Sequence, residues 1–357
     1  MRRIAALGAV VFIITVLLSG CAGWLSSEYL WIQPHEDQGF HKDPLIISVS
    51  SYSQLQNELE RLVSEGAEEV VISASNFNDS TVEFYVNTAV NYILEGTAIG
   101  AYAVDKISYE IGTNRGESVV AFRIEYKHSF NEIRGIKKIS TSEELMAAIE
   151  QALATCERYV VLHTTQYEEV ELTKFISEYA SANPDKVMEI PYVNLVTYPA
   201  TGEERVVEIT LIYLTDKEEL LEMQRQVQVV FTSAELYVRG TAQVMDAYSR
   251  LYSFLMERSE YALQTSITPT FSLLQEAKGD SSAFANVYAA MCRRAGLECD
   301  AVTGLRNGEP WSWNILRHKG KYYHIDLLKC NEEGAFSLTD GSDMTGYAWD
   351  ISQYPIN

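Results

Sequence analysis

From position 45 onward the apolar residues change between two spacings, and the change predicts a regular order of strands and helices. Leu55, Leu59, Leu62 and Val63 recur three and four positions apart, as on one face of an amphipathic helix. A short apolar run at 70–73 predicts a buried strand, and a second helix is expected over 82–94. Two further strands joined by a turn at 114–116 complete a β-α-β-α-β-β unit over residues 45–128.

The same pattern returns about 90 positions later. Residues 49–55 align with 139–145, residues 70–72 with 160–162, and the closing strand 119–126 with 206–213. Ser140 or Thr141 with Glu143 or Glu144 resembles a capping box before the first helix of this second copy. The sequence therefore predicts two αβ repeats, over residues 45–128 and 135–215.

The rest of the chain, 216–357, has a different pattern. Long helical periodicity fills 216–262, and two shorter helices are expected at 271–277 and from 284 to the turn at Gly296. Three strands follow at 299–304, 311–317 and 321–327, separated by the turn pairs Asn307-Gly308 and Lys319-Gly320. We expect an α+β protein whose last domain packs helices on an antiparallel sheet.

The first 21 residues predict a location outside the cytoplasm. Arg2 and Arg3 precede an apolar run at 4–18, which is short for a membrane-spanning helix. Leu18-Ser19-Gly20-Cys21 then resembles the lipobox of bacterial lipoproteins. We expect a signal peptide at 1–20, lipidation of Cys21, a tether over 21–44, and anchoring at the extracytoplasmic face of the cell membrane. An uncleaved anchor with an incidental Cys21 is the alternative.

Charge and cysteine content limit the partners. Asp and Glu total 49 against 28 Lys and Arg, a net charge of −21. So acidic a chain is not expected to bind nucleic acid, or to adhere to anionic lipid through surface charge. Cys156 is expected to be free, while one disulfide among Cys292, Cys299 and Cys330 stays open. No metal site and no cofactor are predicted.

Residues 279–326 resemble the transglutaminase-like, papain-related superfamily. The pattern places a nucleophile at a helix N-terminus, an apolar helix with an A-G-[IL] turn, a strand beginning H-x-W, and a final [IV]-D. The frame is present at Gly279, Phe284, Ala285, Ala295-Gly296-Leu297, Gly304, Trp313-Asn314, Gly320, Tyr322 and Ile325-Asp326.

The residues that carry the chemistry of the superfamily depart from that frame. The resemblance implies a Cys–His–Asp triad, but Ser281 stands in the Cys position and Trp311 in the His position, with only Asp326 retained. A hydroxyl needs an adjacent base, and an indole N–H cannot accept a proton. We therefore predict no enzyme activity. The alternative is an unusual hydrolase or acyl transferase using Ser281 with His324 and Asp326.

The former cleft could still bind a ligand. Ser281, Trp311, Trp313, Asn314 and Asp326 would line it, and aromatic walls with a few polar groups suit an envelope peptide, glycan or protein. The opposite hypothesis is that Trp311 fills the cleft and nothing binds.

Overall fold

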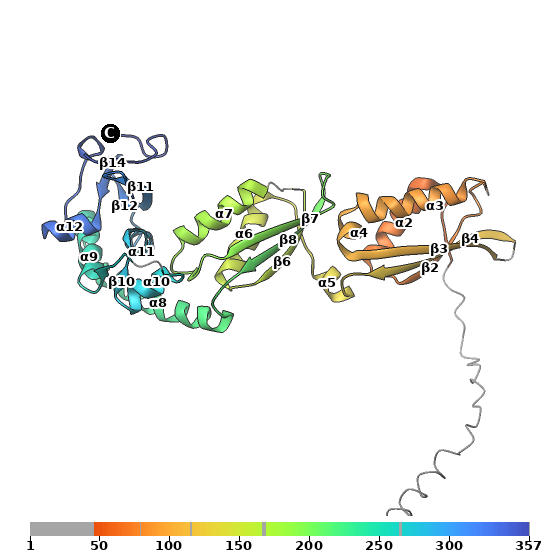
Figure 1. Cartoon of the computed structure of the whole chain (residues 1–357), viewed down its shortest axis with the longest axis horizontal. Helices are drawn as coiled ribbons and strands as arrows, with labels where there is room; N and C mark the ends of the chain where they lie inside the picture. The colour runs from red at the N-terminus through yellow and green to blue at the C-terminus, as the bar shows by residue number, and fades with distance from the viewer. Residues whose placement is uncertain (1–45, 79, 115, 166–168, 264–265, 357) are drawn as a thin grey trace, which may run out of the picture.

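The computed structural model describes residues 46–356 except 79, 115, 166–168 and 264–265. The predicted signal peptide, the tether and Cys21 lie outside the described residues. Figure 1 shows an elongated molecule in which two αβ units and a third, more helical unit follow one another along the long axis. The α+β class predicted from the sequence is confirmed.

The first unit is a four-stranded mixed sheet with helices on one face. Its strand order is β1-β2-β4-β3, with β1 parallel to β2 and the other pairs antiparallel. Its elements are β1 (Ile46–Ser48), α2 (Tyr52–Ser64), β2 (Glu69–Ser73), α3 (Val82–Asn91), a π-helix (Tyr92–Gly96), α4 (Ala98–Ala103), β3 (Val104–Asn114) and β4 (Glu117–Tyr126).

The second unit repeats this topology. Its order is β5-β6-β8-β7, again with the first pair parallel and the other pairs antiparallel. Equal strand order and direction in both sheets agree with the predicted repeat. The elements are α5 (Phe130–Gly135), β5 (Lys137–Ile139), α6 (Ser142–Ala154), β6 (Tyr159–Thr164), α7 (Glu169–Ala182), β7 (Tyr192–Tyr198) and β8 (Arg205–Ile212).

Matching N-caps explain why α2 and α6 start where they do. The side chains of Ser51 and Thr141 accept hydrogen bonds from the backbone N–H groups of Gln54 and Glu144, which the first turn leaves unpaired. Glu144 accepts in return from the N–H of Ser140, one residue before the cap. The predicted capping box is therefore present in a slightly shifted form.

The first repeat contains a helix that periodicity did not predict. Instead of one helix over 82–94, α3 continues into a π-helical turn and then α4. Helix α4 packs on β7 and β8 of the second sheet, where Tyr102 and Val206 are buried with Ile133. The extra helix thus covers the face of the second sheet that α6 and α7 leave open.

The third unit packs helices against an antiparallel sheet of order β13-β12-β11-β14. Its central helix α11 lies against β11 and β12. Its elements are α8 (Lys217–Val238), α9 (Val244–Met256), β9 (Glu260–Tyr261), α10 (Pro269–Gln275), β10 (Lys278–Gly279), α11 (Ser281–Arg294), β11 (Cys299–Arg306), β12 (Glu309–His318), β13 (Lys321–Ile325), α12 (Leu327–Glu333) and β14 (Tyr347–Ala348).

Two further observations concern the cysteines and the membrane. Cys156, Cys292, Cys299 and Cys330 are all buried free thiols. Burial, with Cys292 as a neighbour, raises the pKa of the Cys299 thiol well above its usual value. Within the described ranges, no helix is both long and apolar enough to cross a bilayer.

Candidate functional site

Ser281 is the first residue of α11, immediately after the cap residue Asp280. The carboxylate of Asp280 accepts a hydrogen bond from the N–H of Ala283 at 2.9 Å and so fixes the start of the helix. The hydroxyl oxygen of Ser281 accepts a hydrogen bond from the backbone N–H of Ser312, on β12, at 3.2 Å. The nucleophile position therefore faces the strand that carries the histidine position, as the resemblance implies.

Trp311 and Asp326 are in direct contact. The indole Nε1–H of Trp311 donates to Oδ2 of Asp326 at 2.9 Å. In the superfamily triad an imidazole N–H would make this hydrogen bond to the acid. The sequence resemblance expects this histidine at position 311, where the indole nitrogen of Trp311 is a donor only and offers no acceptor.

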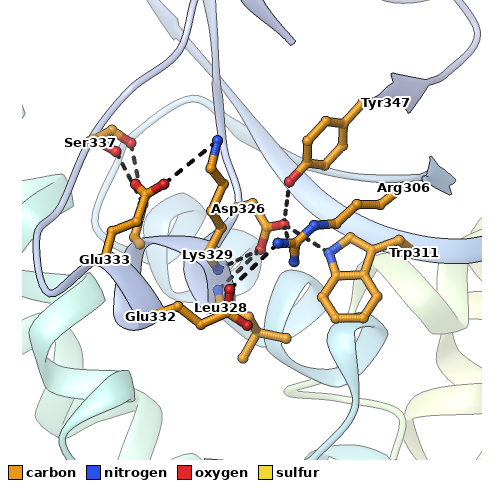
Figure 2. A network of polar contacts seen from close by, with 10 residues as sticks. Arg306, Trp311, Asp326, Leu328, Lys329, Glu332, Glu333, Ser337 and Tyr347 are labelled. Atoms are coloured by element: carbon orange, nitrogen blue, oxygen red, sulfur yellow. Dashed lines mark hydrogen bonds and ion pairs between the residues drawn. The ribbon is translucent and has the colours of Figure 1, made fainter. Parts of the chain in front are cut away.

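Other groups occupy the remaining positions around the Asp326 carboxylate. Figure 2 shows Trp311, Arg306 and Tyr347 converging on it. The Tyr347 hydroxyl donates to Oδ2 at 2.7 Å, and the Arg306 guanidinium lies 3.3 Å from the same oxygen. Oδ1 accepts from the N–H groups of Leu328 and Lys329 and caps α12. The carboxylate is thus enclosed by donors on both oxygens.

Aromatic rings and one cation cover the outer side of this network. The Arg306 guanidinium carbon lies 5.1 Å from the centre of the Trp311 ring and 5.9 Å from that of Tyr347. Tyr261 contacts Trp311 with ring centroids 5.6 Å apart. Tyr261 also pairs with Gly279, two residues before Ser281. Trp311 is therefore held between Arg306 and the strand that flanks the start of α11.

Burial raises the pKa of the Tyr347 hydroxyl, and its hydrogen bond to Asp326 acts in the same direction. The phenol therefore stays protonated and remains a donor to the carboxylate. Arg306, Tyr347, Tyr261 and Ser312 were not predicted as site residues. They lie before, within or far beyond the motif, and a single sequence carries no spacing signal for them.

His324 points into a different environment from Ser281. Its Nδ1 accepts a hydrogen bond from the indole N–H of Trp313 at 3.0 Å, and its ring lies 4.6 Å from that of Trp349. Burial lowers the pKa of His324 to about 4. Among the described residues, no histidine nitrogen is hydrogen bonded to Ser281.

Trp313 and Asn314 are almost fully buried, at 1% and 0% exposure. The side-chain amide of Asn314 donates to the carbonyl oxygens of Ala285 and Asp300 and ties α11 to β11. The two residues support the site from inside the unit. Ser281 and Trp311 are half-buried, so of the predicted cleft residues they have the most surface for a ligand.

Comparison with known proteins agrees with this geometry for part of the chain. Residues 232–341 match the family model described as the transglutaminase-like superfamily. That region is therefore transglutaminase-like, as the motif spacing implied. A search of the curated proteins finds no match for this sequence.

Three solved structures are similar at a remote level. A crystal structure described as a TGase is 10% identical, with a TM-score of 0.26, over 54% of this chain. This chain spans 59% of that protein's length. A candidate cysteine protease from Cytophaga hutchinsonii is 11% identical, with a TM-score of 0.27, over 46% of this chain and 69% of its own. A candidate protease from Parabacteroides distasonis is 9% identical, with a TM-score of 0.25, over 72% and 39%.

Proposed function

We propose that the protein is a lipid-anchored, catalytically inactive transglutaminase-like module that binds a peptide, glycan or protein of the cell envelope. The hydrogen bond from Trp311 to Asp326 is the main support for this proposal. It fills the histidine position with a side chain that can hold the acid but cannot take a proton.

The surroundings of Ser281 also favour binding over catalysis. Acyl transfer needs a base that removes the hydroxyl proton as the bond to the carbonyl carbon forms. The contact made by Ser281 is with a backbone N–H, which donates to the hydroxyl oxygen and removes no proton. His324, the base of the hydrolase alternative, is engaged by Trp313 and favours the neutral form.

The anchor and the location rest on the sequence. Cys21 follows a short apolar run and small residues, and diacylglycerol on its thiol would hold the protein at the extracytoplasmic face. A strongly acidic surface gives little attraction to anionic lipid, so the acyl chains would supply the attachment. Metabolic labelling with a fatty-acid analogue, lost in Cys21→Ala, tests this part.

Restoring the triad tests the assignment of positions 281 and 311. We expect the Ser281→Cys, Trp311→His double variant to carry a thiol with a lower pKa than Ser281→Cys alone, because a nearby imidazole stabilises the thiolate. A decrease of about one pKa unit raises the thiolate fraction at pH 7 by about tenfold. Alkylation rates against pH, read by mass spectrometry on the peptide containing position 281, measure the change.

A matched control separates the effect of adding a base from the effect of removing the indole ring. Ser281→Cys with Trp311→Phe removes the indole without adding an acceptor, so its thiol should react like that of the single variant. The four described cysteines are at most 3% exposed and should react slowly. Equal rates in the His and Phe variants would show that positions 281 and 311 do not meet. Hydrolase activity of the unmutated protein that disappears in Ser281→Ala would instead support the enzyme alternative.

A further inference from the structure

A cavity of about 510 Å³ lies along α11, outside the Asp326 network. Helix α7 of the second repeat, helix α11, strand β11 and the segment after β14 form its walls. Its volume lies within the range of about 300–1,000 Å³ for binding sites of small ligands. It meets the candidate site at Ser282, the neighbour of Ser281.

One wall of the cavity is a strand edge. Four consecutive residues of β11, at 300–303, line the cavity. On its other side β11 pairs with β12 along its whole length, whereas β14 pairs only with Leu305 and Arg306. The cavity therefore lies where the neighbouring strand on this side has ended.

The register shows which backbone groups face that edge. The N–H of Arg317 donates to the carbonyl of Glu298, so these opposite residues form a hydrogen-bonded pair. Since such pairs alternate along an antiparallel ladder, Asp300 and Val302 turn their backbone groups to β12. Ala301 and Thr303 turn theirs outward, as Leu305 does toward β14. In the described part of the chain, no hydrogen bond reaches the outward N–H or C=O groups of Ala301 and Thr303.

The charges around this edge have one sign in excess. Glu178, Asp300 and Asp350 line the cavity, and Asp350 has a lowered pKa because its carboxylate accepts hydrogen bonds from Ser352. Arg293 is the one cationic side chain among the lining residues of this cavity. Its guanidinium donates to the carbonyl oxygens of Cys299 and Ala182, which are backbone groups and carry no counter-charge. Lys174, outside the lining, lies 3.6 Å from the carboxylate of Glu178, so Asp300 and Asp350 against Arg293 leave one negative charge unbalanced.

We propose that an extended peptide segment with basic side chains binds in this cavity as an added strand along Ala301 and Thr303, in line with β14. Its backbone pairs with the outward N–H and C=O groups, and its Lys or Arg side chains meet the carboxylates of Asp300 and Asp350. Serine side chains on α7 and the side chains of Ser282 and Asn286 on α11 form hydrogen bonds with the remaining polar groups of the peptide. The inference rests on the proposed binding function and specifies its ligand.

Three synthetic peptides test the strand pairing on the full chain. The first is acetyl-Lys-Val-Lys-Val-Lys amide, and the other two carry N-methyl groups on its odd or on its even residues. In an added strand only alternate amides face the protein, so one methylated peptide should lose at least tenfold in affinity and the other should bind nearly as well. Calorimetric titration measures all three. Loss in both, in neither, or no binding of the parent peptide would overturn the proposal.

Charge and ligand class have separate controls. The peptide with Glu in place of Lys should bind at least tenfold more weakly than the parent, and Asp350→Lys should reduce that difference severalfold. Asp343→Lys, at an exposed position that is not among the lining residues, is the matched control and should leave the ratio unchanged. Stronger binding of a neutral glucose tetrasaccharide than of the Lys peptide would overturn the proposal in favour of a glycan.

A backbone variant tests the edge directly. Ala301→Pro removes one outward N–H without removing a donor to β12, as proline on an edge strand does. It should weaken peptide binding at least fivefold while the thermal transition stays cooperative. If that variant fails to fold, Asp350→Lys still decides the outcome. None of these peptides or variants involves Ser281 or Trp311, so a failure here leaves the triad assignment standing, and the reverse also holds.

Discussion

The carboxylate of Asp326 holds several elements of the third unit together. One oxygen caps α12, and the other accepts from Trp311 and Tyr347 beside the Arg306 guanidinium. A charged group at 6% exposure is stable only when such donors replace water. The acid is therefore a structural centre of the third unit whether or not a reaction takes place there.

At the residue scale, His324 gives a prediction about pH. Burial holds its pKa at about 4, below the value of about 6.5 in an unfolded chain. The unfolded state then binds more protons between these values, so the protein loses stability as the pH falls from 7.5 to 5, by roughly 2 kcal/mol from this group. Chemical denaturation at both pH values measures the change.

The His324→Gln variant serves as the comparison for that prediction. Glutamine can still accept from Trp313 but does not titrate, so the variant should lack this part of the pH dependence even if it is less stable throughout. Asp340, which favours the charged imidazole, is intact in both proteins. An equal loss of stability on acidification in the two proteins would contradict a buried neutral His324.

At the element scale, β11 and β14 approach each other very closely at one glycine. A Cβ atom at Gly304 would lie 2.2 Å from the carbonyl oxygen of Ala348 and 2.8 Å from the Trp313 ring. Neither group can move aside, because the carbonyl oxygen of Ala348 belongs to the backbone and the Trp313 side chain is buried at 1% exposure. Strand β14 can therefore close over Trp313 only because residue 304 has no side chain.

Gly304→Ala should accordingly destabilise the protein by about 1–3 kcal/mol, the usual cost of an overpacked site. Gly112→Ala is the matched substitution, because Gly112 is also a strand residue but has open space around its Cβ position. It should be neutral or slightly stabilising. Urea unfolding of both variants provides the test, and equal midpoints would contradict the close approach of β14.

At the scale of the whole molecule, the boundaries of the hydrophobic cores do not coincide with the boundaries of the repeats. The first repeat has a core of its own, formed by residues 49–124. The second repeat shares one continuous core with the third unit, from Ile139 to Cys330. Arg294 adds to this union, because its guanidinium lies 3.4 Å from Asp185 and 2.6 Å from the side chain of Gln228.

Truncation should therefore affect the two repeats unequally. A chain that begins at residue 129 keeps the common core and loses the smaller apolar cluster around Tyr102 and Val206, so its melting temperature should fall by no more than about 5 °C. A chain that begins at residue 216 loses α6, α7 and their share of the common core. It should aggregate or unfold without a cooperative transition. Calorimetry of both chains gives the result, and a cooperative transition in the shorter chain would show that the third unit is independent.

Much of this fold could be predicted from one sequence because its signals are local. Helical spacing at Leu55, Leu59 and Leu62, the caps Ser51 and Thr141, and the turns at Asn307-Gly308 and Lys319-Gly320 depend on neighbours within a few positions. Helix α4 was not predicted because the contacts that stabilise it lie in the second repeat, where it covers the sheet face around Val206.

The sequence by itself determined the α+β class and the order of strands and helices in the two repeats, and its motif spacing selected Ser281, Trp311 and Asp326 as candidate positions, because each follows from spacing along the chain. Only the tertiary structure decided what these positions contact. Trp311 meets Asp326 while Ser281 meets the backbone of Ser312. Trp313 and Asn314 lie on opposite faces of β12 and are both buried, because His324 and Trp349 cover one face and α11 covers the other. Arg306 and Tyr347 join the site, and the edge of β11 stays open, through pairings between distant segments that spacing along a single sequence does not encode.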